Sequence, residues 1–100
     1  MQPIHFHMSN DVSGSIISKN VVHHSNQRGF VIHGSHNVQV VDNVAFEIFG
    51  HCYFTEDGIE TGNLFEHNLG AVIREPVNVI PNENDDTPAA FWITNPNNHW

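Results

Sequence analysis

The chain has 100 residues, of which 39% are hydrophobic and only 14% are charged, and its formal net charge is −8 at pH 7. Lys19, Arg28 and Arg74 are the only permanent cations, which excludes nucleic acid and an anionic membrane surface as partners, because both require clustered Lys and Arg. No run of residues approaches the roughly 18 apolar residues of a membrane span, and Cys52 is the single cysteine, so no disulfide forms within the chain.

Short apolar runs separated by polar corners predict strands along the whole chain. The first half has expected strands at 4–8, 16–17, 21–22, 30–32, 38–41 and 44–49, with polar corners at 9–11 and 23–27. The second half has expected strands at 51–54, 64–65, 71–73 and 90–93, with a longer acidic corner at 55–62. No segment combines helical spacing of apolar residues with helix caps, so we expect an all-β fold with little or no helix.

The segment 74–88 interrupts this pattern. Pro76, Pro81 and Pro88 flank the acidic run 82–86, and such a sequence cannot pair as a central strand. We therefore expect an insertion loop at 74–88, after which the strand pattern resumes at residue 90.

Repeated sequence segments indicate a solenoid. The segment 29–37 is similar to the segment 90–98. Three Asn and three Gly residues also recur at intervals of 20 to 25 residues, namely Asn20, Asn43 and Asn68, and Gly29, Gly50 and Gly70. Such periods are typical of a coil in which each turn is one supersecondary unit and a turn Asn can hydrogen-bond to its copy in the next coil. We expect residues 1–100 to form a parallel β-helix of about four coils, a segment of a longer stack, with each set of three at equivalent corners.

Five blocks, in this order along the chain, carry a family resemblance. They are Pro3–Met8 with Asp11–Ser15, His23–Ser25, Val31–Gly34, Gly50–Glu60 and Phe91–Asn98. Together they resemble the right-handed parallel β-helix region of the fibrocystin-like proteins, which is shared with the hyaluronan-binding cell-migration-inducing protein and the cell-surface transmembrane hyaluronidase. Residues 59–63, at the end of the fourth block, and residues 87–89, shortly before the fifth block, are most similar to the fibrocystin-L branch.

The resemblance implies a right-handed, pectin-lyase-like coil in an extracellular or cell-surface protein, the ectodomain of a membrane-anchored parent. We expect a β-helix receptor segment that binds glycan or protein ligands and is flanked by further coils of the parent chain. The alternative is an enzyme domain that depolymerises a hyaluronan-type polysaccharide with the help of a metal ion, either zinc or calcium. Whether the chain is an enzyme stays open at this point.

Histidine and acidic residues are the candidate site. Stacked coils bring residues one turn apart to roughly 4.8 Å, so His7 lies over His33 if 4–7 aligns with 30–33. His5 and His7 lie on one face of a strand. Imidazoles with carboxylates can bind zinc or act as acid and base on a glycan. The candidate metal ligands or catalytic groups are His5, His7, His33 and His51, with Glu56 or Asp57 as the carboxylate.

Structural interpretations of the same residues are also open. His23 and His24 suit a solvated turn. The acidic corner can bind calcium through Glu56, Asp57 and Glu60, or it can be a plain turn at Gly58. Neighbouring strand residues point to opposite faces, so Glu56 and Asp57 converge only if the chain bends there.

Aromatic residues offer a second kind of contact. Phe30 and Phe91 occupy the same place in the repeat and are expected in the core. Trp92 is the candidate residue for binding a sugar ring, because its position alternates with that of Phe91 and faces the other side of the strand.

Overall fold

The computed structural model describes residues 2–76 and 87–100, in which there are strands and no helix. The strands are β1 (Ile4–Asp11), β2 (Ile16–Ser18), β3 (Val21–Ser25), β4 (Phe30–His36), β5 (Gln39–Val41), β6 (Val44–Phe49), β7 (Tyr53–Thr55), β8 (Leu64–Glu66), β9 (Leu69–Arg74) and β10 (Phe91–Trp92). These ranges accordingly contain no helix that is long and apolar enough to cross a membrane.

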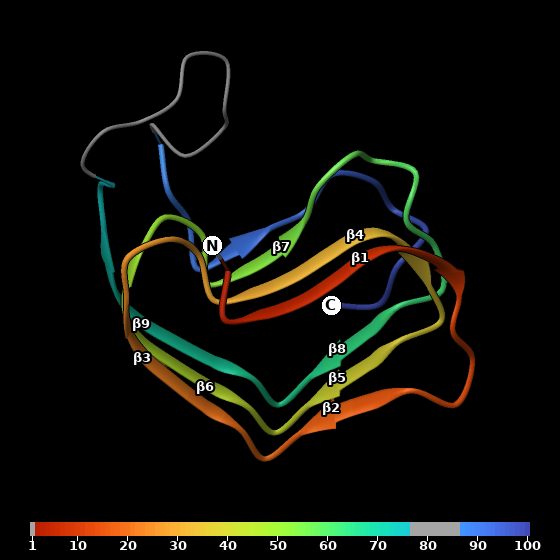
Figure 1. The fold of residues 1–100 in the computed structure, drawn as a ribbon, viewed down its shortest axis with the longest axis horizontal. Coiled ribbons are helices and arrows are strands. Elements are labelled where there is room, and N and C mark those ends of the chain that lie inside the picture. Colours follow the sequence, from red (N-terminus) through yellow and green to blue (C-terminus); the bar gives the residue numbers. More distant parts are fainter. Residues whose placement is uncertain (1, 77–86) are drawn as a thin grey trace.

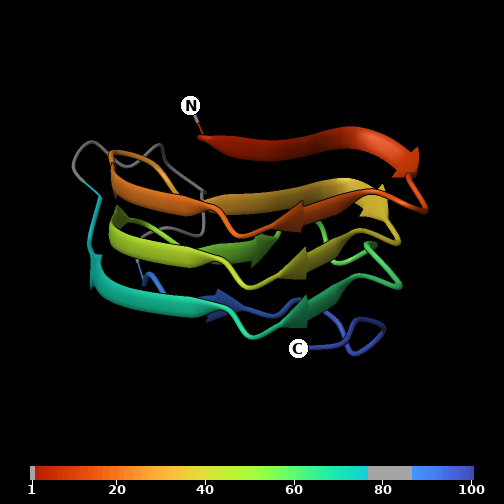
Figure 2. The same cartoon turned by 90° about the horizontal axis from the view of Figure 1, so that it is seen from below.

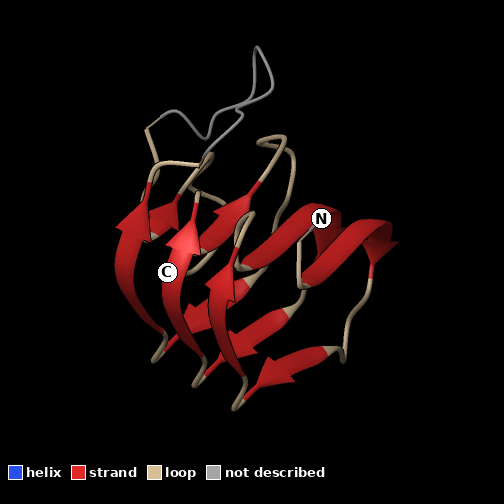
Figure 3. Ribbon diagram, turned by 60° about the vertical axis from the view of Figure 1, so that its left-hand side comes forward, coloured by secondary structure: helices blue, strands red, loops and turns tan. Residues whose placement is uncertain are grey.

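Three parallel sheets surround the interior of the molecule. Their strand orders are β1-β4-β7-β10, β2-β5-β8 and β3-β6-β9, so each strand pairs with the strand three places along the chain. Figure 1 looks along the stack, Figure 2 shows the turns one above another, and Figure 3 shows strands as the regular element throughout. Three complete turns precede β10, which begins a fourth. This all-parallel arrangement is consistent with the expected β-helix.

A strand forms at each expected place, but β7 begins at Tyr53 and not at residue 51, and two expected corners are wrong. β1 continues through 9–11 to Asp11, with a register shift between His7 and Asn10. β3 continues to Ser25, so His23 and His24 are exposed strand residues. Positive φ angles at Asn10 (58°) and His24 (54°) bend these strands without ending them. The expected insertion starts where β9 ends, and residues 77–86 lie outside the described residues.

The interior is packed in layers that follow the strands. The rings of Phe30 and Tyr53, and of Tyr53 and Phe91, are stacked with centroids 5.0 Å apart in each pair. Phe30 and Tyr53 are fully buried, which confirms the core position of Phe30, but Phe91 on the last strand is 39% exposed. The Tyr53 hydroxyl lies 3.0 Å from the carbonyl oxygen of Asn43 and 2.9 Å from that of Leu69. Burial raises the pKa of this phenol, and its hydroxyl joins the interior to two successive turns.

An Asn ladder connects the corners between the second and third sheets. The Oδ1 atom of Asn43 accepts hydrogen bonds from the backbone N–H (3.0 Å) and Nδ2 (3.1 Å) of Asn20. Asn68 receives the same pair of bonds from Asn43, at 3.0 and 3.1 Å. The left-handed conformation belongs to the preceding residues, Lys19, Asp42 and His67, with φ of 57°, 59° and 54°. The predicted equivalence of the three Asn residues is therefore confirmed.

The predicted equivalence of the three Gly residues is wrong. Gly70 lies within β9 opposite Ala45, whereas Gly50 follows β6 with a φ of 99°. Gly29 lies against Cys52, and a Cβ atom there would be 2.6 Å from the Cys52 carbonyl oxygen. The three positions are therefore unlike one another: Gly29 is required by the close approach of Cys52, and Gly50 is favoured by its positive φ.

Candidate functional site

The outer face of the β1-β4-β7-β10 sheet carries most of the candidate residues. His7 is in register with His33 on the neighbouring strand, as predicted. The backbone N–H of Glu56 donates to the Ile32 carbonyl oxygen at 3.1 Å, which places Glu56 next in the same column. His5 lies two residues before His7 and therefore on the same face. Three successive turns thus contribute to one site, which we call the histidine column (His5, His7, His33 and Glu56).

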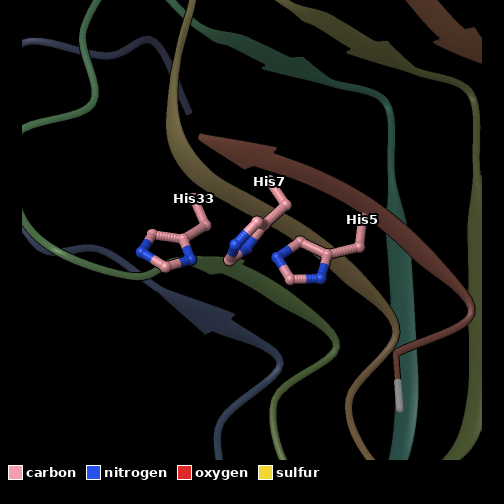
Figure 4. A group of neighbouring side chains, drawn as sticks. All are labelled: His5, His7 and His33. Atoms are coloured by element: carbon pink, nitrogen blue, oxygen red, sulfur yellow. The ribbon is translucent and has the colours of Figure 1, made fainter. Parts of the chain in front are cut away.

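The three imidazoles of this column point toward one another (Figure 4). Ring centroids are 5.0 Å apart for His5 and His7, 4.8 Å for His7 and His33, and 6.0 Å for His5 and His33. One nitrogen of each ring lies within 4.8 Å of the other two. His7 is exposed and the other two are half-buried, so the group is accessible from solvent.

Two carboxylates approach the same imidazole. Asp57 Oδ2 is 2.7 Å from His33 Nε2, and Glu56 Oε2 is 3.4 Å from His33 Nδ1. β7 ends at Thr55, so the chain bends and both acidic side chains reach one face. The sequence predicted that Glu56 and Asp57 converge only if the chain bends there, and the structure has this bend.

Glu60 has a different place in this corner. It is fully buried, and its carboxylate accepts hydrogen bonds from the backbone N–H groups of Asp57 at 2.8 Å and Ile59 at 3.3 Å. Glu60 therefore holds the turn in shape. Both of its carboxylate oxygens accept from backbone N–H groups, whereas Glu56 and Asp57 face His33.

Arg28 belongs to the site and was not predicted. Its Nη1 atom is 3.4 Å from Glu56 Oε1, and its guanidinium lies 4.4 Å from the centre of the Phe54 ring. The side chain is only 3% exposed. A sequence signal existed, since Arg28 is one of three permanent cations and stands two residues before a buried strand. It orients Glu56 from the side opposite His33.

The electrostatic environment favours a neutral His5. Burial is the largest cause that lowers the pKa of His5 below 6.5, followed by the neighbouring His7. His33 and Arg28 act in the same direction, and Glu56 opposes them. The Nε2 atom of His5 is buried and has no hydrogen-bond partner among the described residues. A neutral imidazole with an unpaired nitrogen is the form that binds a metal ion or accepts a proton.

The structure does not bring His51 into the histidine column. His51 is fully buried, and its ring lies 4.8 Å from that of Phe54 and 4.6 Å from that of Trp92. Its Nδ1 atom accepts a hydrogen bond from the Ala89 N–H at 3.1 Å. Because this stacking engages the ring before β7 begins, His51 supports the half-buried Trp92.

Comparisons with known proteins agree with this architecture. Residues 1–100 match the family described as CEMIP beta-helix. The chain belongs to the CEMIP β-helix family. It is 41% identical over 98 residues to fibrocystin-L of Mus musculus, covering 96% of this chain and 2% of that protein. It is 32% identical over 127 residues to the cell surface hyaluronidase of Danio rerio, covering 97% of this chain and 9% of that protein.

A further relative comes from Dictyostelium discoideum. Protein rliB of Dictyostelium discoideum is 40% identical over 109 residues, which covers 93% of this chain and 10% of that protein. The chain therefore spans a tenth or less of the length of these three relatives. No solved structure gives a significant match. The family resemblance expected from the sequence is confirmed, and so is its fibrocystin-like character.

Proposed function

We propose that this member of the CEMIP β-helix family is part of a cell-surface or extracellular protein, and that the outer face of its β1-β4-β7-β10 sheet binds a glycan. The observation that carries the proposal is the combination of a half-buried indole with a polar cluster on one face. Trp92 is held by the buried His51 ring at 4.6 Å. A relative supports the location, since it is named a cell surface hyaluronidase.

The spacing of the two parts suits an extended ligand. Trp92 continues the column of Phe54 on the last strand of the sheet, whereas His33 lies on β4, two strands away. Two inter-strand spacings amount to about 10 Å, a separation that an oligosaccharide can bridge. An aromatic face that packs against a sugar ring, with nearby groups that hydrogen-bond its hydroxyls, is the usual composition of a small-molecule site.

The charges of this face favour a neutral glycan. Arg28 is the permanent cation of the site, and it is nearly buried and paired with Glu56. Asp57 and Glu56 are acidic and lie nearer the solvent. A polyanionic ligand would therefore need a compensating cation or protonated imidazoles. The proposal takes the coil as right-handed, since parallel crossovers are right-handed with few exceptions.

Trp92→Ala in the full-length protein tests this function on a glycan array. We expect the wild type to bind at least one glycan class, and Trp92→Ala to weaken that binding about tenfold, since an aromatic contact contributes about 0.5–1.5 kcal/mol beyond its buried area. Phe46→Ala is the matched control, because Phe46 is a 41% exposed aromatic residue on a different sheet. A wild type that binds no glycan, or equal losses in both variants, would contradict the proposal.

A second function, cleavage of the glycan, is favoured by one observation. His33 lies between two carboxylates, at 2.7 Å from Asp57 and 3.4 Å from Glu56, and such a set can transfer protons at a glycosidic bond. The relative from Danio rerio is named a hyaluronidase. Chain-length analysis of polysaccharides incubated with the full-length protein separates binding from cleavage. Shortened products that Glu56→Gln abolishes would support an enzyme, whereas unchanged chain lengths would support a receptor.

A further inference from the structure

We infer that His5, His7 and His33 form a binding site for one divalent transition-metal ion, for which zinc is the best match. The three rings come from two paired strands, and one nitrogen of each lies within 4.8 Å of the others. This inference goes beyond glycan binding and does not require it. Either one can fail while the other stands.

The first support is a buried imidazole nitrogen that lacks a hydrogen-bond partner. His5 Nε2 is buried without a hydrogen-bond partner in the described part of the chain, although buried polar atoms are almost always paired. No hydrogen bond joins the three described rings, which meet only through ring contacts at 4.8 to 6.0 Å. A purely structural cluster would be expected to satisfy its own nitrogens. A metal ion would satisfy all three nitrogens at once.

The second support is the negative charge beside the cluster. Glu56 Oε2 lies 3.4 Å and Asp57 Oδ2 lies 2.7 Å from the two nitrogens of His33. These two carboxylates would compensate the charge of a divalent cation held by the imidazoles.

The third support is an outer shell of the kind that metal sites use. A metal-binding His usually donates its other N–H to a carboxylate, which fixes the tautomer and the ring orientation. Asp57 Oδ2 lies 2.7 Å from His33 Nε2, so His33 can donate there and present Nδ1 to the ion. Glu56 Oε2 is 3.4 Å from that Nδ1 atom. Either Glu56 or water would complete a fourth position, and Arg28 limits the movement of Glu56.

The chemistry of the ligands selects zinc over calcium. Three imidazole nitrogens suit zinc and its transition-metal neighbours, whereas calcium takes six to eight oxygen ligands. Nitrogens bound to a tetrahedral zinc ion lie about 3.3 Å apart, since each Zn–N bond is about 2.0–2.1 Å long. Side-chain rotation can shorten the present distances of up to 4.8 Å between the three ligand nitrogens, and the exposed His7 has room to move.

Metal content of the full-length protein, measured after zinc loading and dialysis, tests the inference. We expect the wild type to retain one more zinc per chain than His7→Ala. Asp57→Asn should bind that zinc about 10- to 100-fold more weakly in titration calorimetry, as expected for loss of an outer-shell carboxylate. Calcium content should be the same in all variants.

His67→Asn is the matched control. His67 is an exposed imidazole outside the cluster, with 77% of its side chain accessible, and Asn tolerates its φ of 54°. We expect this variant to retain the zinc. Circular dichroism verifies folding, and His7→Gln replaces His7→Ala if the latter loses its sheet spectrum. Equal zinc in the wild type and the folded His7 variant, or an equal loss in His67→Asn, would overturn the inference.

Discussion

Two columns of residues run through the same stack of strands and differ in what they leave unsatisfied. The Asn ladder repeats one residue in three turns, and each amide bonds to the next at 3.0–3.1 Å. The histidine column changes from His7 to His33 to Glu56 across three turns. It also contains a buried His5 nitrogen with no partner in the described residues.

The difference distinguishes scaffold from site. A column that repeats the same residue can satisfy every polar group with its own neighbours, which stabilises the stack. The histidine column varies from turn to turn: His33 pairs with Glu56 and Asp57, but the buried His5 nitrogen stays unpaired among the described residues, which costs stability unless a ligand pairs with it. We therefore expect substitutions in the Asn ladder to change the free energy of unfolding, and substitutions in the histidine column to change binding.

Asn43→Ala should give the largest effect on stability. Asn43 is 1% exposed, and its side chain makes hydrogen bonds to Asn20, Asn68 and the Ile17 carbonyl oxygen. Losing these bonds leaves several buried groups unpaired, which should lower the free energy of unfolding by about 3–5 kcal/mol. Chemical denaturation measures it, with the exposed Asn26→Ala as control, for which a change within about 0.5 kcal/mol is expected. A loss below about 1 kcal/mol would mean that the ladder is not the scaffold.

The pH dependence of stability should report the histidine column. The pKa of His5 is lower in the folded chain than its ordinary value of 6.5. The unfolded chain therefore binds the proton more readily, so this contribution is complete above pH 6.5 and is lost as the pH falls toward the folded pKa. The groups that face His5 and act on its pKa are His7, His33 and Arg28, which lower it, and Glu56, which raises it.

Thermal melts in a chelator, at pH 7.5 and pH 5, measure this contribution. His5→Gln should reduce the difference between the two melting temperatures, whereas His67→Asn should leave it unchanged. An equal pH dependence in the wild type and His5→Gln would show that His5 is not held neutral by the fold.

The smallest expected effect is on the chemical reactivity of a buried thiol in the core. Cys52 is fully buried, and desolvation raises the pKa of its thiol from 9.0 to about 11. The thiolate is the reactive form, so the folded chain should not react with a thiol reagent at pH 8, and denaturant should expose one reactive thiol from Cys52. Rapid labelling of Cys52 in the folded protein would place it outside the core.

The sequence predicted the strands and the repeat well because both follow from residue type and spacing. It also predicted the pairing of His7 with His33 from the alignment of 4–7 with 30–33. It missed a second pair of stacked amides, in which Asn63 Nδ2 donates to Asn98 Oδ1 at 2.9 Å. The two residues are 35 positions apart because residues 74–88 intervene, so the period hides them.

The residue that the sequence misplaced, His51, and the one that it missed, Arg28, share a physical cause. Strand alternation describes residues inside a strand, but His51 and Arg28 lie just before strands, where the backbone direction is set by packing. His51 therefore packs against Trp92 and Phe54, and Arg28 lies over the Phe54 ring. The three Gly residues are 21 and 20 positions apart, which is less than the 23 to 26 positions that separate paired residues of the first three turns, so they fall at different places in the coil.

Anomalous diffraction at the zinc absorption edge, from crystals of the zinc-loaded full-length protein, tests most directly that the histidine column is a site. The account predicts an anomalous peak about 2.0–2.1 Å from one nitrogen each of His5, His7 and His33, with Asp57 still bonded to His33. Three ordered imidazoles with no peak between them, or a peak held by other residues, would contradict it.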